Sequence, residues 1–300
     1  MKHDCTILIP VCNGGTLLRD CLAAVLAQET RGSREILAID SGSTDGSAEF
    51  LKQQPVRLLQ IPNGEFGHGS TRNLGVRESD SDFIVLLSQD AVPCGTNWLE
   101  SLLRPFGNAK CGGVYGRQLP RNTHACERHF LEKTYPEAPA VRRASGNAPL
   151  TLRDMFFSNV NSACRRELLL RWPFREDLVM SEDQQWAKDA LLGGFELHYV
   201  PDACVFHSHR YTVKQVFRRY FDSGASLRLI SNGKIGDTPA AIFRYLYEEI
   251  LLALNEEGVG ALPHVIAYEL ARFFGYRAGN CEPWLPLWAK RFLSANRTYW

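Results

Sequence analysis

The sequence predicts an α/β fold with a mainly parallel central sheet, because short apolar runs alternate with amphipathic segments from residue 5 to residue 88. Hydrophobic residues make up 45% of the 300-residue chain, which is ample for a sizeable core. The 34 Lys and Arg residues nearly balance the 33 Asp and Glu residues, so the chain has no overall field to hold a long polyanion. These observations favour a Rossmann-like nucleotide-binding domain and argue against nucleic acid as a partner.

Hydrophobic periodicity and turn residues predict the secondary structure of the first part of the chain. We expect the alternation strand 5–10, helix 16–28, strand 35–40, helix 43–53, strand 56–62, helix 70–79 and strand 82–88. Leu18, Leu22 and Val25 share one face of the first helix, and a Ser-Thr-Asp cap opens the second. Such crossovers place successive strands side by side.

The pattern loosens after Cys111. Residues 112–130 show no clear period, and the polar, Pro-bearing stretch that follows, 131–149, is predicted to be a loop or mobile segment. Regular structure is expected to return at 152–174, with a helix at 182–194 and a strand at 195–201. From Val213 the chain reads as helical and aromatic.

The cysteine pattern and the N-terminus indicate a cytoplasmic protein. The nine cysteines are an odd number, widely scattered and without a CxxC pair, which is typical of reduced core residues. The N-terminal apolar run is too short for a signal peptide, and no stretch approaches the roughly 20 apolar residues that span a bilayer.

Polar residues follow the predicted strands where each one ends. In a parallel sheet these ends meet at one edge, so the side chains can converge on one crevice. The residues concerned are Asn13, Asp40, Arg72 and Asp90. Taken alone, Asp90 is equally explained as a turn residue before a Val-Pro step.

Several motifs carry a resemblance to a known family. The segments "TILIPVCNGG", "AIDSGSTDGS", "GSTRNLG", "SQDA" and "SEDQQWAKDALLGGF" occur in that order. The chain resembles the inverting family 2 glycosyltransferases of the GT-A fold and, with "FGHGSTRN", "GRQLP" and "HSHRYTVKQVFRRYFDSG", the bacterial rhamnosyltransferases of O-antigen synthesis. The resemblance implies a catalytic domain at 1–212, with a nucleotide-binding half (1–115) and an acceptor half (116–212), followed by a helical region at 213–300.

The resemblance implies a donor site. Asp40 matches the aspartate that hydrogen-bonds the nucleotide base, with Asn13 and Ser41 beside it, and Arg72 matches an arginine that supports the diphosphate. Gln89 and Arg117 are expected to contact the nucleotide sugar, and Gln118 the donor-sugar or acceptor side. Asp90 takes the place of the last acid of a DxD motif and would hold Mg²⁺ or Mn²⁺.

Ser88 departs from the family pattern, which has a carboxylate at this position. We interpret this loss as a match to a dTDP donor, whose deoxyribose lacks the 2′-hydroxyl. His207 resembles a histidine that completes the metal site in some GT-A enzymes, and imidazole beside a carboxylate would suit Mn²⁺ as well as Mg²⁺. A core histidine bonded to the backbone explains His207 equally well.

The "SED" segment predicts the catalytic acids. Inversion needs a base to take the acceptor's proton, and Asp183 matches the family's catalytic aspartate, with Glu182 as its neighbour. The alternative is that both acids only cap a helix.

The C-terminal aromatic and basic residues fit either helix packing or contact with an anionic membrane surface. The resemblance implies dTDP-L-rhamnose as donor, a lipid-linked saccharide as acceptor, and a peripheral position at the inner face of the cell membrane. Two alternatives stay open at this point. One is another GT-A chemistry, with a different hexose or a nucleotidyl group, and the other is a non-catalytic sugar-nucleotide sensor.

Overall fold

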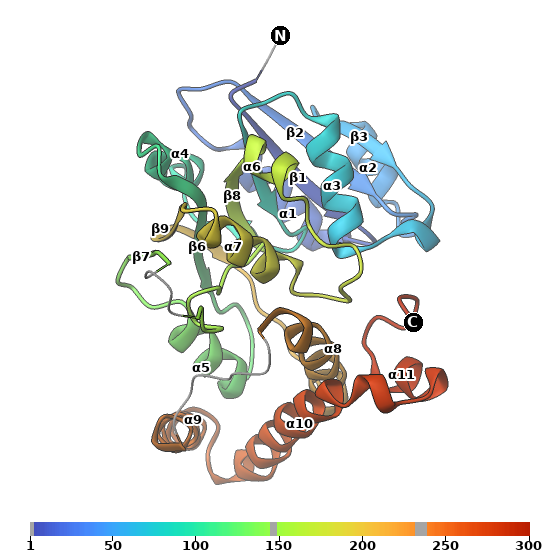
Figure 1. The fold of residues 1–300 in the computed structure, drawn as a ribbon, viewed down its shortest axis with the longest axis vertical. Coiled ribbons are helices and arrows are strands. Elements are labelled where there is room, and N and C mark those ends of the chain that lie inside the picture. Colours follow the sequence, from blue (N-terminus) through green and yellow to red (C-terminus); the bar gives the residue numbers. More distant parts are fainter. Residues whose placement is uncertain (1–2, 145–148, 232–238) are drawn as a thin grey trace.

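The computed structural model describes residues 3–144, 149–231 and 239–300. Its core is one sheet of nine strands, ordered β3-β2-β1-β4-β8-β6-β9-β5, with β7 paired to β9. Helices cover the faces of this sheet, and the C-terminal helices form a separate layer at one end (Figure 1). The α/β fold with a C-terminal helical region is therefore confirmed.

The N-terminal part alternates strands and helices as predicted. Its elements are β1 (Cys5–Val11), α1 (Gly15–Leu26), β2 (Arg34–Asp40), α2 (Ser47–Lys52), β3 (Arg57–Gln60), α3 (His68–Glu78) and β4 (Phe83–Leu87), with a short 3₁₀ turn at Asn63–Glu65. The pairings of β1 with β2, β1 with β4 and β2 with β3 are all parallel. Val11 stands opposite Asp40 at the carboxyl edge, so the loops after β1 and β2 begin side by side.

The second part extends the same sheet with antiparallel strands. Its elements are β5 (Val92–Pro93), α4 (Trp98–Leu103), a 3₁₀ turn at Arg104–Gly107, β6 (Cys111–Leu119), α5 (Ala125–Thr134), β7 (Ala140–Arg142), β8 (Asn161–Arg165), α6 (Arg166–Arg171), α7 (Glu182–Leu192) and β9 (Glu196–Phe206). β8 runs antiparallel to both β4 and β6, whereas β9 is parallel to β6. The expected division into nucleotide-binding and acceptor halves stays a prediction.

The predicted loop at 131–149 is wrong at 131–134, which end helix α5, and at 140–142, which form β7. The looser stretch before it contains regular structure that the sequence pattern did not indicate. Residues 111–119 form β6, which lies inside the sheet between β8 and β9, and 125–134 form helix α5. Glycines hid the strand, because glycine is depleted in strands and breaks the alternation of side chains. At Gly116 a Cβ atom would lie 1.9 Å from the carbonyl oxygen of Ala203, so β9 and β6 approach too closely for any side chain there. Residues 145–148 lie outside the described residues.

Two hydrophobic clusters cover the two faces of the sheet. Ile7 and Ile9 of β1 pack with α1 on one face, whereas Leu8 points to the opposite cluster, which contains Trp186 of α7. Side chains alternate between faces along a strand, and a strand buried on both faces reads as a continuous apolar run. The central strands are thus fixed between two layers, and their ends hold the site residues in place.

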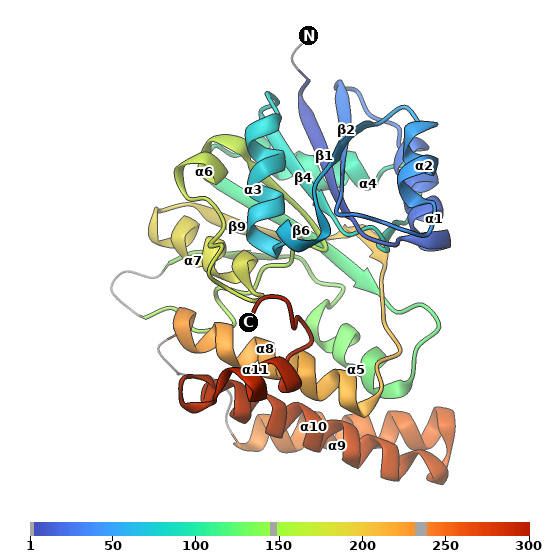
Figure 2. The same ribbon diagram turned by 90° about the vertical axis from the view of Figure 1, so that its right-hand side faces the viewer.

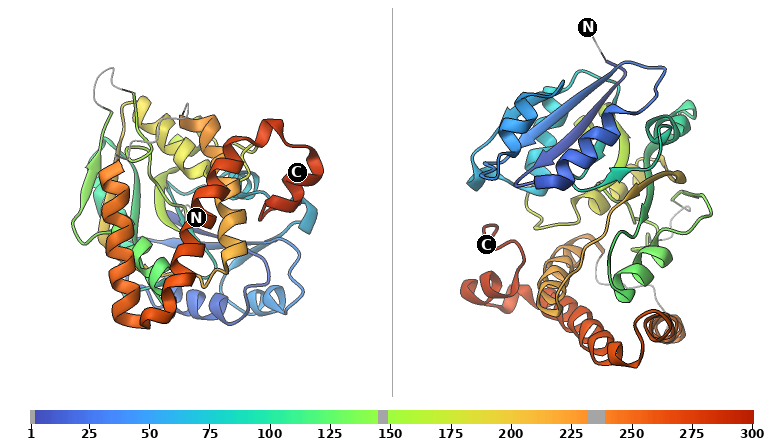
Figure 3. Two further views of the ribbon diagram at one scale, coloured as in Figure 1. Left: turned by 90° about the horizontal axis from the view of Figure 1, so that it is seen from below. Right: turned by 180° about the vertical axis from the view of Figure 1, so that it is seen from behind.

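The C-terminal helices are α8 (Val213–Ser231), α9 (Pro239–Glu257), α10 (Leu262–Asn280) and α11 (Leu287–Leu293), with 3₁₀ turns at Val259–Ala261 and Glu282–Trp284. α8 lies between the sheet and α10 (Figures 2 and 3). Cβ atoms added at Gly224, Gly275 or Gly279 would lie 2.1–2.4 Å from carbonyl oxygens of the partner helix, so α8 and α10 meet backbone to backbone. None of the helices in the described ranges combines the length and apolar character needed to cross a membrane.

Candidate active site

Asp40 lies at the end of β2 and is fully buried. Its Oδ2 accepts a 3.3 Å hydrogen bond from the amide of Ser43, whereas Oδ1 is buried without a hydrogen-bond partner in the described residues. An unsatisfied buried oxygen is costly, so it favours an external donor such as the N–H group of a nucleotide base.

Asn13 and Ser41 hold the two neighbouring loops together. Asn13 has a left-handed backbone (φ 50°), its Oδ1 accepts a 2.8 Å bond from the amide of Thr44, and its own amide donates to Ser43. Ser41 donates from its amide and its hydroxyl to the carbonyl of Val11, at 2.8 and 3.0 Å. Both residues therefore lie where the loops after β1 and β2 meet, next to the end of β2 that carries Asp40.

Both polar atoms of the Gln89 side-chain amide form hydrogen bonds with the backbone of Cys12. The Cys12 amide donates to Gln89 Oε1 at 3.0 Å, and Gln89 Nε2 donates to the Cys12 carbonyl at 3.0 Å. This side chain fixes the loop after β1 against the loop after β4. Gln89 thus lies beside the crevice, with its polar groups already bonded.

Asp90, His207 and His209 form a cluster whose ligand atoms lie within 4.8 Å of one another. Asp90 Oδ1 lies 3.6 Å from His207 Nε2, and its Oδ2 lies 3.8 Å from His209 Nε2. Of these two histidines, only His207 was predicted from the sequence as a ligand. The signal was present, because residues two apart in an extended segment point to the same side.

Gln118 sets the tautomer of His207. His207 Nδ1 donates to Gln118 Oε1 at 2.9 Å, while Gln118 Nε2 donates to Tyr135 Oη at 2.6 Å and to Ser158 Oγ at 3.0 Å. Burial lowers the pKa of His207 to about 4, so its ring is neutral at pH 7. The lone pair of Nε2 therefore faces Asp90, which is the arrangement of a metal-ligating histidine.

The cluster fits the divalent cation that the resemblance implies. One carboxylate and two imidazoles suit Mn²⁺ and other borderline ions better than they suit Mg²⁺, which prefers oxygen. The distances of 3.6 and 3.8 Å fall between the roughly 3.0 Å of adjacent ligands and the roughly 4.2 Å of opposite ligands around an ion with bonds of about 2.1 Å. Asp90, His207 and His209 are the residues that would hold it.

A second centre lies at the start of α7. Arg72 Nη1 donates to Glu182 Oε1 at 3.0 Å and also to the carbonyl of His68, and both charged side chains are buried. Burial opposes ionisation of Glu182, but the charges of Arg72 and His68 outweigh it and lower the pKa of this carboxyl. The structure pairs two predicted site residues with each other.

Asp183 has the opposite electrostatic environment. Burial, followed by the charge of Glu182, raises the pKa of Asp183 to about 7. Its Oδ1 accepts from the amide of Gln184 at 2.8 Å, and its Oδ2 accepts from the amide of Asn159 at 3.1 Å. A carboxylate that is oriented by two amides and gains a proton near pH 7 is suited to general-base chemistry.

One loop connects the two centres. Asn159 contacts Asp183 through its amide and Glu182 through its side chain, and the preceding residue, Ser158, accepts from Gln118. Gln118 in turn bonds His207 of the cluster. The acids Asp90 and Asp183, 93 positions apart in the sequence, therefore border one region of the structure.

Arg117 is not brought into the cluster. Its Nη1 lies 3.4 Å from Oε1 of Glu137, an exposed partner, and its neighbour Gln118 points to the other face of β6. Of the two side chains predicted in "GRQLP", Gln118 reaches His207 and Arg117 does not.

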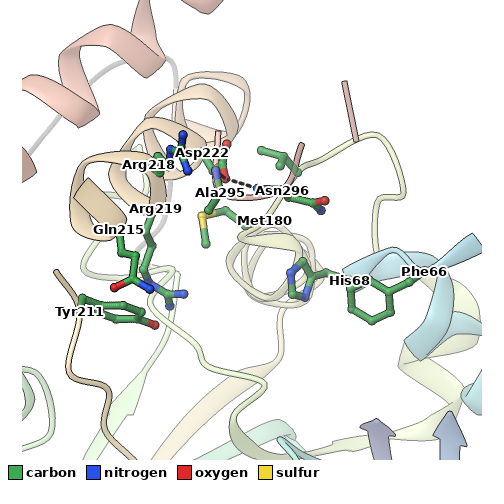
Figure 4. Close-up of a pocket in the computed structure, with 11 residues that line it drawn as sticks. Phe66, His68, Met180, Tyr211, Gln215, Arg218, Arg219, Asp222, Ala295 and Asn296 are labelled. Atoms are coloured by element: carbon green, nitrogen blue, oxygen red, sulfur yellow. Dashed lines mark hydrogen bonds between the residues drawn. The ribbon is translucent and has the colours of Figure 1, made fainter. Parts of the chain in front are cut away.

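A cavity of about 490 Å³ opens beside these centres. Figure 4 shows His68 and Phe66 on one side and Tyr211, Gln215 and Arg219 on the other. The full lining is Phe66, His68, Val179, Met180, Tyr211, Gln215, Arg218, Arg219, Asp222, Ala295 and Asn296. This volume falls within the range typical of small-molecule sites. α8 and the C-terminal segment thus supply much of the wall, which the sequence analysis did not foresee.

Comparison with known proteins places this site in a family. Residues 6–171 match the model of glycosyl transferase family 2. The chain is 29% identical to the O-antigen chain rhamnosyltransferase WbaN of Salmonella anatum and 30% identical to RfbN of Salmonella typhimurium, over 98% of this chain and 95% of each relative.

Solved structures share the fold. The mannosyltransferase PcManGT from Pyrobaculum calidifontis, in complex with GDP-Man and Mn²⁺, matches with a TM-score of 0.58 and 19% identity over 100% of this chain and 85% of that one. S. aureus TarS 1-349 matches with a TM-score of 0.53 and 14% identity, over 95% of this chain and 92% of that one. The expected GT-A fold is confirmed, and the chain belongs to glycosyl transferase family 2.

Proposed function

We propose that this glycosyltransferase moves L-rhamnose from dTDP-L-rhamnose, with inversion, to a lipid-linked saccharide of O-antigen-like polysaccharide synthesis. The observation that carries the proposal is the pairing of an acid whose pKa lies near 7, Asp183, with the cluster at Asp90 through the loop at Ser158 and Asn159. The near full-length similarity to two proteins named rhamnosyltransferases supports the donor sugar.

Each of the site residues would have a separate role in an inverting transfer. Asp40 Oδ1 would accept from the thymine ring of the donor, since it is buried and otherwise unsatisfied. Asp183 would take the proton of the acceptor hydroxyl as that oxygen attacks the anomeric carbon. A divalent cation held by Asp90, His207 and His209 would supply positive charge for the diphosphate. Glu182, fixed by Arg72, would keep Asp183 basic.

Ser88 provides a test of the donor. Its amide bonds the carbonyl of Val160, which places this residue at the carboxyl end of β4 beside the cluster. In Ser88→Asp the added carboxylate would be available to a ribose 2′-hydroxyl, so we expect a shift of preference from dTDP toward UDP. Thermal stabilisation by the two nucleotides, with and without Mn²⁺, measures the shift. An unchanged preference in Ser88→Asp would contradict this explanation for the missing acid.

Screening nucleotide sugars tests the donor directly. Binding of a ligand to the folded state raises its stability in proportion to RT ln(1 + [L]/Kd). dTDP-L-rhamnose should therefore raise the melting temperature more than UDP-hexoses or GDP-mannose, and Mn²⁺ should enlarge the effect. A larger response to a UDP-hexose would assign a different sugar to the same site.

Peripheral membrane contact is proposed for the C-terminal helices. Phe243 (76% exposed), Tyr247 and Leu251 are spaced by four on α9, and Trp284 (87%) and Trp288 (73%) protrude around α11. On α10 the exposed apolar residues are Ile266, Leu270, Phe273 and Phe274. Apolar stripes of this kind mark interaction surfaces, and the exposed Arg244, Arg277 and Arg291 would favour anionic lipid.

Vesicle co-sedimentation tests this surface. Wild type should sediment with vesicles that contain phosphatidylglycerol, and high salt or the change Trp284→Ser with Trp288→Ser should release it. Leu17→Ser, on the exposed face of α1, is the matched control, and it should sediment like wild type. Equal sedimentation of the double variant and wild type would rule out these tryptophans as the contact.

A further inference from the structure

Arg219 of α8 lines the cavity, and the acidic group that acts on it electrostatically, Glu127, is not within ion-pair distance. In the described residues its guanidinium forms neither an ion pair nor a hydrogen bond, and the residue is solvent-exposed. The guanidinium forms a cation–π contact with Tyr211, whose ring centroid lies 5.6 Å from Arg219 Cζ. Figure 4 shows the guanidinium beside Tyr211, facing the space that also borders His68.

The side chain lies close to the candidate metal cluster. The ring of Tyr211 lies 4.8 Å from that of His209, which in turn lies 4.7 Å from the ring of His207. The positive charge of Arg219 acts on both histidine rings. The same charge acts on His68 from the other side of the cavity. Arg219 is therefore within electrostatic reach of both walls.

Two other arginines lie near this cavity. Arg72 is bonded to Glu182, whereas Arg218 also lines the cavity without an ion pair in the described residues, with its guanidinium carbon 5.8 Å from the ring of Phe292. Figure 4 shows Arg219, and not Arg218, on the side of Tyr211. Lys214, on the same helix as Arg219, is exposed and is not among the residues that line the cavity. An unpaired guanidinium in a concave site is suited to an oxyanion, because its fork geometry matches phosphate oxygens.

We propose that Arg219 binds the diphosphate of the nucleotide-sugar donor, opposite the Asp90 cluster, so that α8 completes the active site. This inference rests on the proposed function. In the transfer, the bond from the anomeric carbon to the diphosphate oxygen breaks and its electron pair stays on that oxygen. The acceptor oxygen forms the new bond and its proton passes to Asp183. Arg219 neutralises the charge that grows on the departing diphosphate.

Nucleotide binding measured by calorimetry tests this role. Arg219→Gln should weaken dTDP binding in the presence of Mn²⁺ by roughly 10- to 100-fold, the usual effect of losing a charge-assisted hydrogen bond. Thymidine, which lacks phosphate, should bind equally to wild type and variant. Arg219→Lys should recover part of the loss. Lys214→Gln, which removes the same charge from the same helix, should bind dTDP like wild type.

The outcomes separate this inference from the proposed function. Unchanged dTDP affinity in Arg219→Gln overturns the role of Arg219 while leaving the donor site in place. A rise in KM for the acceptor alone also overturns it, because it assigns the guanidinium to an acceptor phosphate. Failure of wild type to bind dTDP, UDP or GDP overturns the proposed function and this inference with it.

Discussion

Arg72 Nη1 and Glu182 Oε1 lie 3.0 Å apart in a buried ion pair that joins the second turn of α3 to the first turn of α7. This ion pair gives the two adjacent acids, Glu182 and Asp183, opposite pKa shifts. Glu182 is kept ionised by its partner, whereas Asp183 receives the repulsion of that negative charge and binds its proton more tightly. Two neighbouring carboxyl groups with clearly different pKa values are typical of sites of acid–base catalysis.

Asp183→Asn should abolish proton transfer and leave donor binding intact. We expect kcat to fall by about 10²–10⁴-fold, the usual contribution of a general base, with dTDP affinity close to that of wild type. Asp189→Asn is the matched control, since Asp189 lies on the same helix and bonds only Gln185 in the described residues. Comparable activity of Asp183→Asn and Asp189→Asn would rule out the catalytic role.

The rate should rise with pH through about 7. The base must be unprotonated, so log(kcat/KM) should climb with unit slope below the pKa of Asp183, about 7, and level off above it. Rates with saturating metal at each pH, compared between wild type and Glu182→Gln, measure this. Removal of the neighbouring charge should move the inflection to lower pH, and an inflection that stays in place would contradict the assignment.

The same carboxyl should affect stability with a defined sign. The pKa of Asp183 is raised in the folded state, so its contribution to stability is present at low pH and is lost as pH rises through about 7. Asp183→Asn should therefore raise the melting temperature at pH 8 more than at pH 5. Scanning calorimetry at the two pH values checks the difference, with Asp189→Asn showing none.

Breaking the buried ion pair should be costly. Glu182→Gln or Arg72→Met leaves one charge buried and unpaired, which typically costs about 3–5 kcal/mol of folding free energy. The double variant should lose less than the sum of the two single variants, because it leaves no orphaned charge. Urea unfolding of the four proteins measures the coupling, and strict additivity would show that the pair contributes no coupling energy.

Gln118 should control metal affinity without touching the ion. Gln118→Leu removes the acceptor that orients His207, so Mn²⁺ binding should weaken by about 10- to 100-fold. Gln118→Glu keeps an acceptor oxygen at this position and should bind Mn²⁺ close to wild type. Titration of free Mn²⁺ by electron paramagnetic resonance reads this without substrate, and equal affinity in all three proteins would contradict the role.

The sequence predicted those elements that depend on hydrophobic periodicity and turn residues. The first four strands and the helices between them follow from hydrophobic periodicity, and the convergence of Asp40 and Asp90 follows from parallel strands ending at one edge. Strand β6 was missed because its glycines serve close packing against β9 and not strand propensity.

Long-range partnerships could not be read from the chain. The bond between Arg72 and Glu182 spans 110 positions, and that between Gln118 and His207 spans 89. Neither is encoded in a local period, so sequence patterns predict a separate role for each residue, whereas the structure shows that the paired side chains are bonded to each other. Arg219 appeared only as part of a basic aromatic segment, because its significance depends on what lies across the cavity.

The glycine contact between α8 and α10 limits how this architecture can be recombined. The backbone carbonyls of Tyr276 and Phe217 lie against Gly224 and Gly275 of the opposing helix, where no side chain would fit. The two helices therefore pack as one block. A chimaera with a relative would need to exchange both helices together, since a junction between them would separate surfaces shaped for each other. Grafted as a unit, the block would carry the α8 side chains that line the cavity, so a hybrid enzyme would inherit that wall intact.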